Sequence, residues 1–387
     1  MPYCEGRLFY DADSHIMEMP DWLSQHVDPE WRESIPPMDL SRIGLLADQI
    51  GSLSPDGRHD PATVAELERN VIGGAKGYLA LGAANAAERS RALDLIGVQA
   101  QLVFSGVSVT QFLYVDDVDI KYAGARAHNR AMAQWCADDP RMLGVAIVPL
   151  HDPVRALAEA AYAVELGCKA FWVRAMPDGD RSPGHPDLDP FWELLADAGT
   201  PFIVHIGAQN QQIRPAYMNN GRPRPKDFLG GGEVMRSKDY TTFHQLAEAF
   251  LSTLILDGVL ERFPTLKGAA IEFGCTWVPG WFQRLQHAAE VWGRTEPHLL
   301  EFSRSPRQQV LDQMTFTSLP FEDVGAAIRA TSPELFMFGT DYPHVEGSRD
   351  PLGKMMSTLT DLDEDTLDKF FAGNFAKMMR LPTRTTP

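Results

Sequence analysis

The stretch LGVAIVPLHDPVRALAEAAYAVELGCKAFWVRA, residues 143–175, decides the fold class because it reads as strand, helix and strand. Apolar residues fill most of Met142–Leu150 and the end of Gly167–Ala175, as in strands that are buried on both faces of a sheet. Between them, Asp152–Glu165 opens with an aspartate cap and a first-turn proline and then shows helical periodicity. This pattern predicts a parallel βαβ unit.

The same unit recurs along the chain. Runs such as PFIV (201–204) and ELFMF (334–338) are again apolar almost throughout, and Asp187–Ala198 repeats the capped helical pattern. Longer connecting stretches separate eight β-type runs. These runs are Arg7–Asp13, Ala100–Gly106, Met142–Leu150, Gly167–Ala175, Pro201–Gly207, Leu266–Gly274, Gln313–Ser318 and Leu335–Tyr342. Eight parallel strands with helical crossovers predict an α/β protein with a closed (β/α)8 TIM barrel.

Two connections are too long to be simple loops, one at about residues 16–99 and one at 208–238. Both follow the carboxyl ends of strands, where barrel active sites are built, so they are predicted to be lid insertions in a single domain spanning residues 1–387. The second insertion carries six lysine and arginine residues against two acidic ones, a charge of +4. A cationic lid that attracts phosphate or carboxylate and a solvated loop that binds nothing are both open interpretations.

Composition restricts the partners of the protein. The chain has 387 residues with 35 Lys and Arg against 52 Asp and Glu, so its formal charge of −17 repels nucleic acid and anionic membranes. No apolar run approaches the roughly 18 residues of a membrane span, and the first residues lack the features of a signal peptide. The cysteines form no C-x-x-C pair, which argues against a disulfide scaffold or zinc finger. We expect a cytoplasmic protein without nucleic-acid or membrane partners.

Ionisable residues gather where the predicted strands end. The first strand leads into Asp11-Ala-Asp13-Ser-His15, and period-two alternation places these three polar side chains on one side. Later strands end in His205, Glu272 and Asp341, with His344 close behind. Burying so many charges around one axis is very unfavourable unless a cation compensates them. Carboxylate and imidazole ligands without a thiolate predict iron, manganese or zinc.

The order of these residues resembles that of the amidohydrolase superfamily. In that superfamily, strand one carries D-x-[HD]-x-H, strand five His, strand six Glu or His, and strand eight Asp. The strings WVPGW (277–281) and GTDYPH (339–344) point to its amidohydrolase-2 branch, which includes decarboxylases of aromatic and muconate acids such as the aminocarboxymuconate-semialdehyde type. The resemblance implies that Asp13 and His15 replace the paired first-strand histidines and that His205 and Asp341 occupy their family positions.

Three positions depart from the commoner form of that family. Asp13 stands where that form has a histidine, and Glu272 stands where it has its strand-six histidine. Strand four ends near Arg174, so the lysine that bridges two metals in many hydrolases of the superfamily has no counterpart. The shell therefore shifts toward carboxylates, with Glu18 and His344 close enough in sequence to join it.

A carboxylate-rich shell resembles a smaller branch of this barrel family that activates dioxygen at two non-haem iron ions, as in hydroxylation of a diterpenoid in platensimycin and platencin biosynthesis. The leading hypothesis is thus a di-iron monooxygenase that acts on a bulky apolar acid or its coenzyme A thioester. It implies metal ligands at Asp13, His15, Glu18, His205, Glu272, Asp341 and His344, with Asp341, His344 and Glu272 also acting in catalysis. Arg174, Arg222 and Arg224 are expected to bind the acid end of the substrate.

Other interpretations stay open. The hydroxylase would need electrons from an external reductase, because no flavin or nicotinamide motif is visible. The main alternative is a hydrolase or non-oxidative decarboxylase that uses one zinc or manganese ion, with Asp341 or His344 moving protons. A barrel that only binds a ligand is a third, less favoured class. The helix patterns are compatible with either a monomer or a homodimer.

Overall fold

The computed structural model describes residues 2–39, 59–207, 213–223 and 237–381. Within these ranges, eight strands form one sheet in sequence order, and each is parallel to its neighbours. The strands are β1 (His15–Ile16), β2 (Gln101–Ser105), β3 (Met142–Ile147), β4 (Ala170–Trp172), β5 (Phe202–His205), β6 (Gly268–Ile271), β7 (Met314–Thr317) and β8 (Phe336–Met337). All eight fall in or next to the predicted runs.

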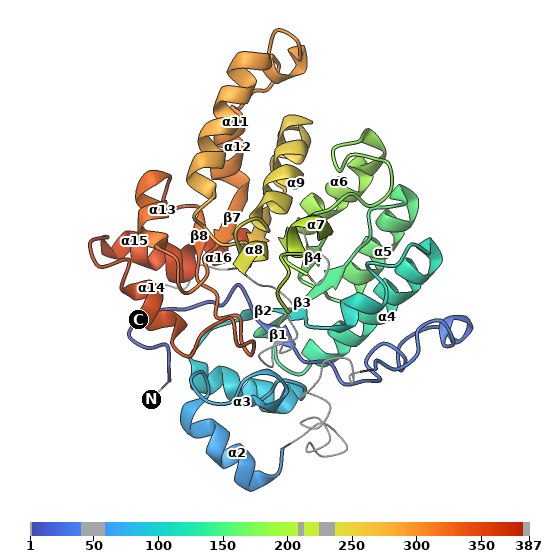
Figure 1. The fold of residues 1–387 in the computed structure, drawn as a ribbon, viewed down its shortest axis with the longest axis vertical. Helices are drawn as coiled ribbons and strands as arrows, with labels where there is room; N and C mark the ends of the chain where they lie inside the picture. Colours follow the sequence, from blue (N-terminus) through green and yellow to red (C-terminus); the bar gives the residue numbers. More distant parts are fainter. Residues whose placement is uncertain (1, 40–58, 208–212, 224–236, 382–387) are drawn as a thin grey trace.

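Helices surround these strands (Figure 1). Their bounds are α2 (Pro61–Leu67), α3 (Ala86–Ile96), α4 (Val118–Cys136), α5 (Pro153–Glu165), α6 (Asp189–Ala198), α7 (Pro215–Met218), α8 (Ser237–Tyr240), α9 (His244–Leu256), α10 (Val259–Arg262), α11 (Val278–Trp292), α12 (Pro306–Gln313), α13 (Val324–Ala330), α14 (Pro351–Met356), α15 (Glu364–Asp368) and α16 (Asn374–Met378). The cap predicted for α5 is present, because the Asp152 carboxylate accepts the backbone N–H groups of Val154 and Arg155. No described helix combines the length and apolar character needed to cross a bilayer.

The sheet curls until its first and last segments meet. Backbone hydrogen bonds join Ala12 N–H to Phe338 O at 3.0 Å, His15 N–H to Tyr342 O at 2.7 Å and Asp341 N–H to Asp13 O at 2.8 Å. This seam explains why regular β1 is shorter and later than the predicted Arg7–Asp13. Residues 11–14 divide their backbone hydrogen bonds between the β2 side and the β8 side, and the regular β1 ladder is confined to His15–Ile16.

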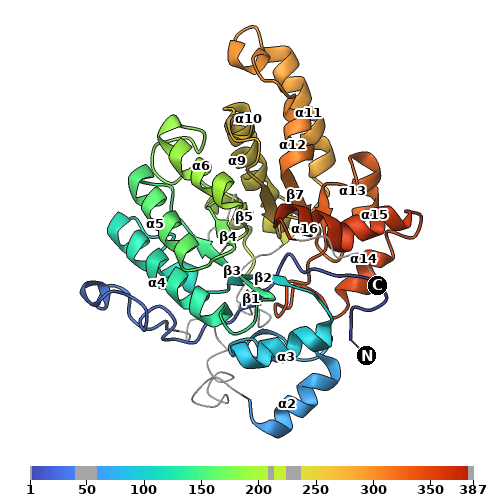
Figure 2. The ribbon, with the colours of Figure 1, turned by 180° about the vertical axis from the view of Figure 1, so that it is seen from behind.

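Alternation along the strands divides the buried side chains into two layers. One cluster fills the barrel interior and includes Leu102, Phe104, Val145, Ile147, Trp172, Ile203 and Ile271. The other lies between strands and helices and includes Val103, Ala146, Phe171, Val204, Ala270 and Phe316. Phe375 and Met378 of α16 join the interior cluster, and Figure 2 shows this helix from behind. Apolar residues therefore fill the barrel below the polar strand ends.

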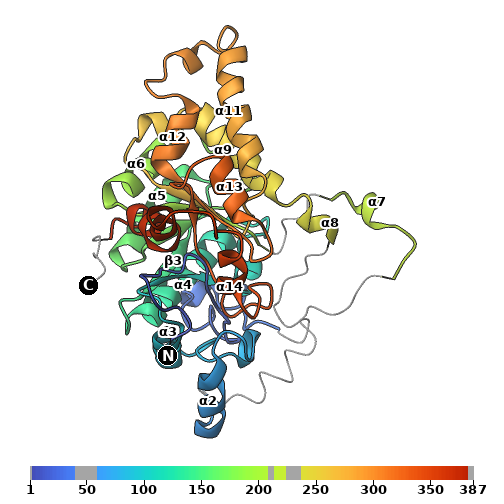
Figure 3. The same ribbon diagram turned by 90° about the vertical axis from the view of Figure 1, so that its left-hand side faces the viewer.

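The predicted insertions are only partly within the described residues. In the first, α3 buries Ala92, Leu93 and Ile96 completely and forms the crossover between β1 and β2, so this portion belongs to the barrel wall. In the second, α7 stands away from the barrel and α8 returns toward it (Figure 3). Residues 40–58, 208–212 and 224–236 lie outside the described residues. A lid function for either insertion stays a prediction.

Candidate metal centre

Two histidines at the carboxyl ends of strands direct the same ring nitrogen to one point. His15 Nδ1 lies 3.0 Å from the carbonyl oxygen of Ser105, and His205 Nδ1 lies 2.7 Å from that of Ile206. A carbonyl oxygen only accepts hydrogen bonds, so each Nδ1 carries the proton. The Nε2 lone pairs are thereby directed toward the barrel axis, which is the usual arrangement of metal-binding histidines.

Asp13 lies between these two rings. Its Oδ1 is 3.3 Å from His205 Nε2 and 3.4 Å from His15 Nε2, and all three side chains are almost completely buried. Burial opposes ionisation of Asp13, but hydrogen bonds from the two histidines outweigh it and lower the pKa of this carboxyl. Burial likewise opposes the charged form of His205, yet the bond to Asp13 raises its pKa. The Nε2 lone pairs of the two histidines face the Asp13 carboxylate. Without a metal, protons bound between these groups must supply the positive charge that offsets this repulsion.

Two further carboxylates reach the same point from β6 and β8. Glu272 Oε2 is 3.5 Å from His205 Nε2, and Asp341 Oδ1 is 3.6 Å from His15 Nε2. Both residues have left-handed backbone conformations, with φ of +63° and +52°, which cost a non-glycine residue about 1–2 kcal/mol each. Burial and then the charge of Asp13 raise the pKa of Asp341 well above its usual value. Glu272 and Asp341, each with a strained backbone conformation, thus lie beside the carboxylate of Asp13.

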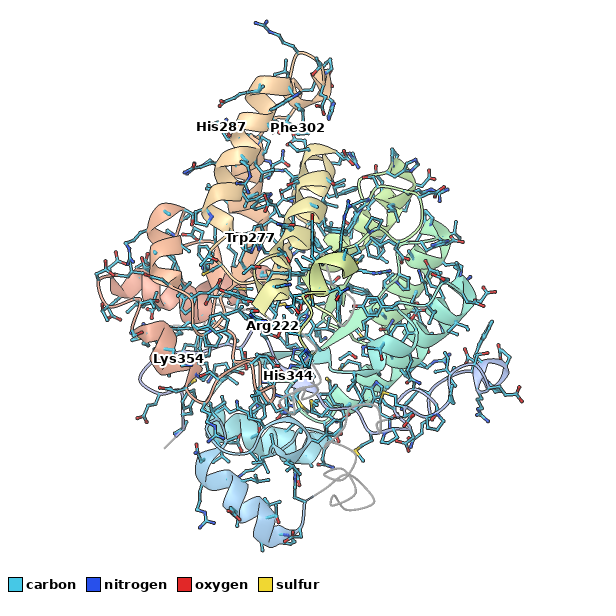
Figure 4. All side chains as sticks on the ribbon, viewed as in Figure 1. Arg222, Trp277, His287, Phe302, His344 and Lys354 are labelled. Atoms are coloured by element: carbon cyan, nitrogen blue, oxygen red, sulfur yellow. The ribbon has the colours of Figure 1, made fainter. Side chains whose placement is uncertain are left out.

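His344, labelled in Figure 4, completes the cluster. Its Nδ1 is 3.0 Å from Asp341 Oδ1, and its ring stacks on that of His15 with centroids 4.0 Å apart. Burial lowers the pKa of His344. His344 Nδ1 and Asp341 Oδ1 are within ion-pair distance but do not form a hydrogen bond in this structure.

The side chains together fit a bound cation. Their ligand atoms form three overlapping groups, each within 4.8 Å: Asp13 with His15 and His205, His15 with Asp341 and His344, and Asp13 with Glu272 and Asp341. Neighbouring ligands on a single ion with bonds of about 2.1 Å are separated by about 3.0–3.4 Å. The separations of 3.3–3.6 Å between Asp13, His15, His205, Glu272 and Asp341 are close to that spacing. The cluster can therefore hold a divalent metal ion between oxygen and imidazole ligands.

The structure does not support Glu18 as a ligand. Its carboxylate accepts five hydrogen bonds from the turn after β2, given by the hydroxyls of Ser105 and Ser108 and by the backbone N–H groups of Gly106, Val107 and Ser108. Because these donors occupy both oxygens, Glu18 anchors the turn and does not belong to any of the three ligand groups. A ligand role for Glu18, expected from its proximity in sequence to Asp13 and His15, stays a prediction that these hydrogen bonds do not favour.

We expect Glu18→Gln to lower the free energy of unfolding by about 2–4 kcal/mol without changing metal content, because it replaces a buried anion that receives several charge-assisted hydrogen bonds. Urea unfolding and elemental analysis of the purified variant measure both quantities. The exposed Glu165→Gln is the matched control and should change stability by less than about 0.5 kcal/mol. A normal stability with loss of the metal would instead make Glu18 a ligand.

The three arginines predicted to bind substrate lie in different parts of the chain, and only two of them are within the described residues. Arg222 is exposed on the segment that follows α7, which Figure 3 shows standing away from the barrel. Arg224 lies outside the described residues. Arg174 follows β4 and is partly buried, with its guanidinium 4.9 Å from the centre of the Tyr114 ring. Only Arg174 is thus found next to the barrel mouth, and the substrate-binding roles stay predictions.

A supporting network behind the cluster was missed. Alternation places Asp11 with Asp13, but its buried carboxylate accepts the backbone N–H of Asp13 and both the N–H and the hydroxyl of Thr340. The fully buried Arg89 donates to the carbonyl oxygen of His15. Asp11 therefore joins the ligand-bearing segments of the first and last strands. Nothing in the sequence connects Arg89 with this site, because the contact spans 74 residues.

The chain is similar to known proteins in sequence family and in fold. A family model described as amidohydrolase matches residues 82–381. Among solved structures, an amidohydrolase from Mycobacterium avium subsp. paratuberculosis is similar with a TM-score of 0.70 and 21% identity, covering 97% of this chain and 100% of the other. The 5-carboxyvanillate decarboxylase LigW from Sphingomonas paucimobilis is similar with a TM-score of 0.62 and 20% identity, covering 97% and 100%.

A third similar structure contains a metal. It is a dihydroxybenzoic acid decarboxylase from Polaromonas sp. JS666 with bound manganese and the inhibitor 2-nitroresorcinol, with a TM-score of 0.61 and 18% identity. The alignment covers 97% of this chain and 98% of that chain. At these identities the solved structures establish that the fold is shared.

Proposed function

Because the chain belongs to the amidohydrolase family, we propose that it is a non-oxidative decarboxylase that removes CO2 from an aromatic acid at one manganese or zinc ion. Two structural relatives are decarboxylases of 5-carboxyvanillate and dihydroxybenzoic acid, and the second binds manganese. These relatives favour the decarboxylase alternative of the sequence interpretation over its leading di-iron hypothesis. They give no support to two iron ions, dioxygen or an external reductase.

The observation that carries the proposal is the convergence of Asp13, His15, His205 and Asp341 at a spacing suited to one ion. These four residues would hold the metal. Glu272 lies on the His205 side of the cluster and would contribute a fifth ligand or a negative charge beside it. The hydrogen bonds that Glu18 accepts favour a shell without it, which would have one anionic ligand fewer than the di-iron hypothesis assumed.

Decarboxylation of an aromatic acid replaces a carbon–carboxylate bond with a carbon–hydrogen bond, so one proton must reach that carbon. A bound divalent metal would supply positive charge that orients the substrate's acidic oxygens. The Asp341–His344 pair, with 3.0 Å between Oδ1 and Nδ1, is the group that can hold and deliver the proton. The buried ring of His15 stacks on His344 and restrains its orientation.

The test combines metal analysis with an activity assay. We expect one manganese or zinc ion per chain, CO2 release from members of a panel of hydroxybenzoic acids, and no oxygen consumption. The panel includes 2,6-dihydroxybenzoate and 5-carboxyvanillate, and the zinc-, manganese- and iron-loaded proteins are compared. Two iron ions per chain together with reductant-dependent oxygen consumption would restore the monooxygenase hypothesis and contradict the decarboxylase.

A further inference from the structure

Side-chain alternation in β4 places Arg174 above the wall of the metal centre. Ala170 and Trp172 belong to the cluster in the barrel interior, whereas Phe171 and Val173 belong to the outer cluster. Arg174 continues the inward series at the carboxyl end of the strand. The Trp172 ring, two residues earlier, has its centroid 5.1 Å from that of His205. Arg174 therefore lies next to the site on its β4 side.

Both inward side chains at this end of β4 have a hydrogen-bond donor without an acceptor. Arg174 Nε and Trp172 Nε1 are buried, and neither has a hydrogen-bond partner among the described residues. Arg174 Nη2 has only the sulfur of Met176 at 3.7 Å, and no described carboxylate lies within ion-pair distance of the guanidinium. A buried donor without an acceptor is unfavourable, so each of these groups is suited to an oxygen atom of a ligand.

Arg174 also lines a cavity of about 350 Å³ between the loop after β4 and α9. Met176, Leu188 and Phe250 contribute apolar walls, and the volume lies within the range of small-molecule sites. The buried carboxylate of Asp178 does not neutralise Arg174, because it bonds Lys121 Nζ at 2.5 Å and Leu150 N–H at 3.1 Å. The cavity thus combines an apolar wall with a cation that has no acidic partner among the described residues.

The position of Tyr114 connects the cavity with the metal centre. A Cβ atom at Gly207, two residues after His205, would lie 2.1 Å from the Tyr114 hydroxyl and 3.4 Å from Trp172 Cζ2. Tyr114 is therefore packed directly against the end of β5, and its other face receives the Arg174 guanidinium. Trp172 contacts His205, and Tyr114, packed at the end of the same strand β5, contacts Arg174, so the cavity wall lies beside the metal centre.

We propose that this cavity binds the apolar part of an organic anion, while Arg174 binds an anionic oxygen of the same molecule. If the proposed function holds, on which this step rests, the molecule is the substrate, and the substrate is an aromatic acid with an apolar substituent rather than a small hydroxybenzoate alone. The reacting carboxylate then lies at the metal centre and the substituent extends into the cavity.

Binding is tested without turnover, using 8-anilinonaphthalene-1-sulfonate as an apolar anion and the full-length, manganese-loaded protein. We expect Arg174→Gln, and Ala249→Phe on the exposed cavity edge of α9, each to weaken binding about tenfold in a fluorescence titration. The controls Arg329→Gln and Ala326→Phe change exposed residues of α13 and should bind as the wild type does. Equal affinity for all five proteins would overturn the binding site.

The substrate assignment is tested by steady-state kinetics with 2,6-dihydroxybenzoate and its 4-pentyl derivative. We expect Ala249→Phe to lower kcat/KM about tenfold for the pentyl acid and less than twofold for the small acid. An equal effect on both acids would overturn the assignment of the cavity to the substituent. Dye binding that follows the expected pattern while neither acid loses CO2 would leave the binding site standing and remove the decarboxylase proposal.

Discussion

Asp341→Asn is expected to lower kcat by at least about 10³-fold in the metal-saturated protein, because the variant loses both an anionic ligand and a group that can share a proton with His344. The fold should survive this change. Asparagine has nearly the same shape as aspartate and tolerates the left-handed conformation at φ +52° better than most residues. The lower kcat should therefore come from lost chemistry and not from unfolding, and the circular dichroism spectrum of the variant should match that of the wild type.

Initial rates of CO2 release at saturating manganese measure this effect, with metal content determined on the same samples. The exposed Asp365→Asn on α15 is the matched control and should keep the wild-type rate. A variant that retains the metal but not activity assigns Asp341 mainly to proton transfer, whereas loss of the metal assigns it mainly to binding. An Asp341→Asn protein within tenfold of the wild-type kcat would exclude it from either role.

Metal removal is the second large effect. In the metal-free protein, the carboxylates of Asp13, Glu272 and Asp341 lie close together in a buried site, where their mutual repulsion is unfavourable. Chelation should therefore abolish activity and reduce stability. Manganese at 100 times its dissociation constant should raise the free energy of unfolding by about 2.7 kcal/mol, since it binds only the folded chain. Denaturant unfolding with and without manganese measures the difference.

His205→Gln separates specific binding from a general salt effect. The variant lacks the Nε2 lone pair that lies 3.3 Å from Asp13, so manganese should no longer stabilise it measurably. The control His298→Gln changes an exposed histidine and should keep the full stabilisation. If manganese stabilised His205→Gln as strongly as the wild type, the metal would bind somewhere other than this cluster.

The fold was largely predictable from sequence because fully buried parallel strands leave apolar runs such as LGVAIVPL, whose character does not depend on distant partners. The convergence of His205, Glu272 and Asp341 followed from the same logic, since each ends an apolar run and barrel topology brings strand ends together. The position of β1 was less accurate, because residues 11–14 bond to two neighbours in an irregular way that only the closed barrel produces.

Side-chain partners across the chain were not predictable. Glu18 resembled a ligand in sequence, but the backbone N–H groups of residues 106–108 donate hydrogen bonds to its carboxylate oxygens. Such partners could not be predicted, because every residue except proline has a backbone N–H group. The supporting role of Asp11 was likewise not predicted, since its partners, the backbone of Asp13, Thr340 and the Gln101 side chain, lie mostly on other strands. The cavity beside Arg174 depends on the relative placement of α9 and the loop after β4, which sequence periodicity does not specify.

The seam between the first and last strands has a consequence for biosynthesis. Asp13 and His15 emerge from the ribosome early, whereas Asp341 follows more than three hundred residues later and is fixed to Asp13 by a backbone hydrogen bond. A nascent chain therefore carries an incomplete ligand set through most of its translation, and shortened chains that end before the eighth strand stay incomplete. If Asp13, His15 and Asp341 hold the metal as proposed, we expect finished chains to bind it and chains that lack the eighth strand not to do so.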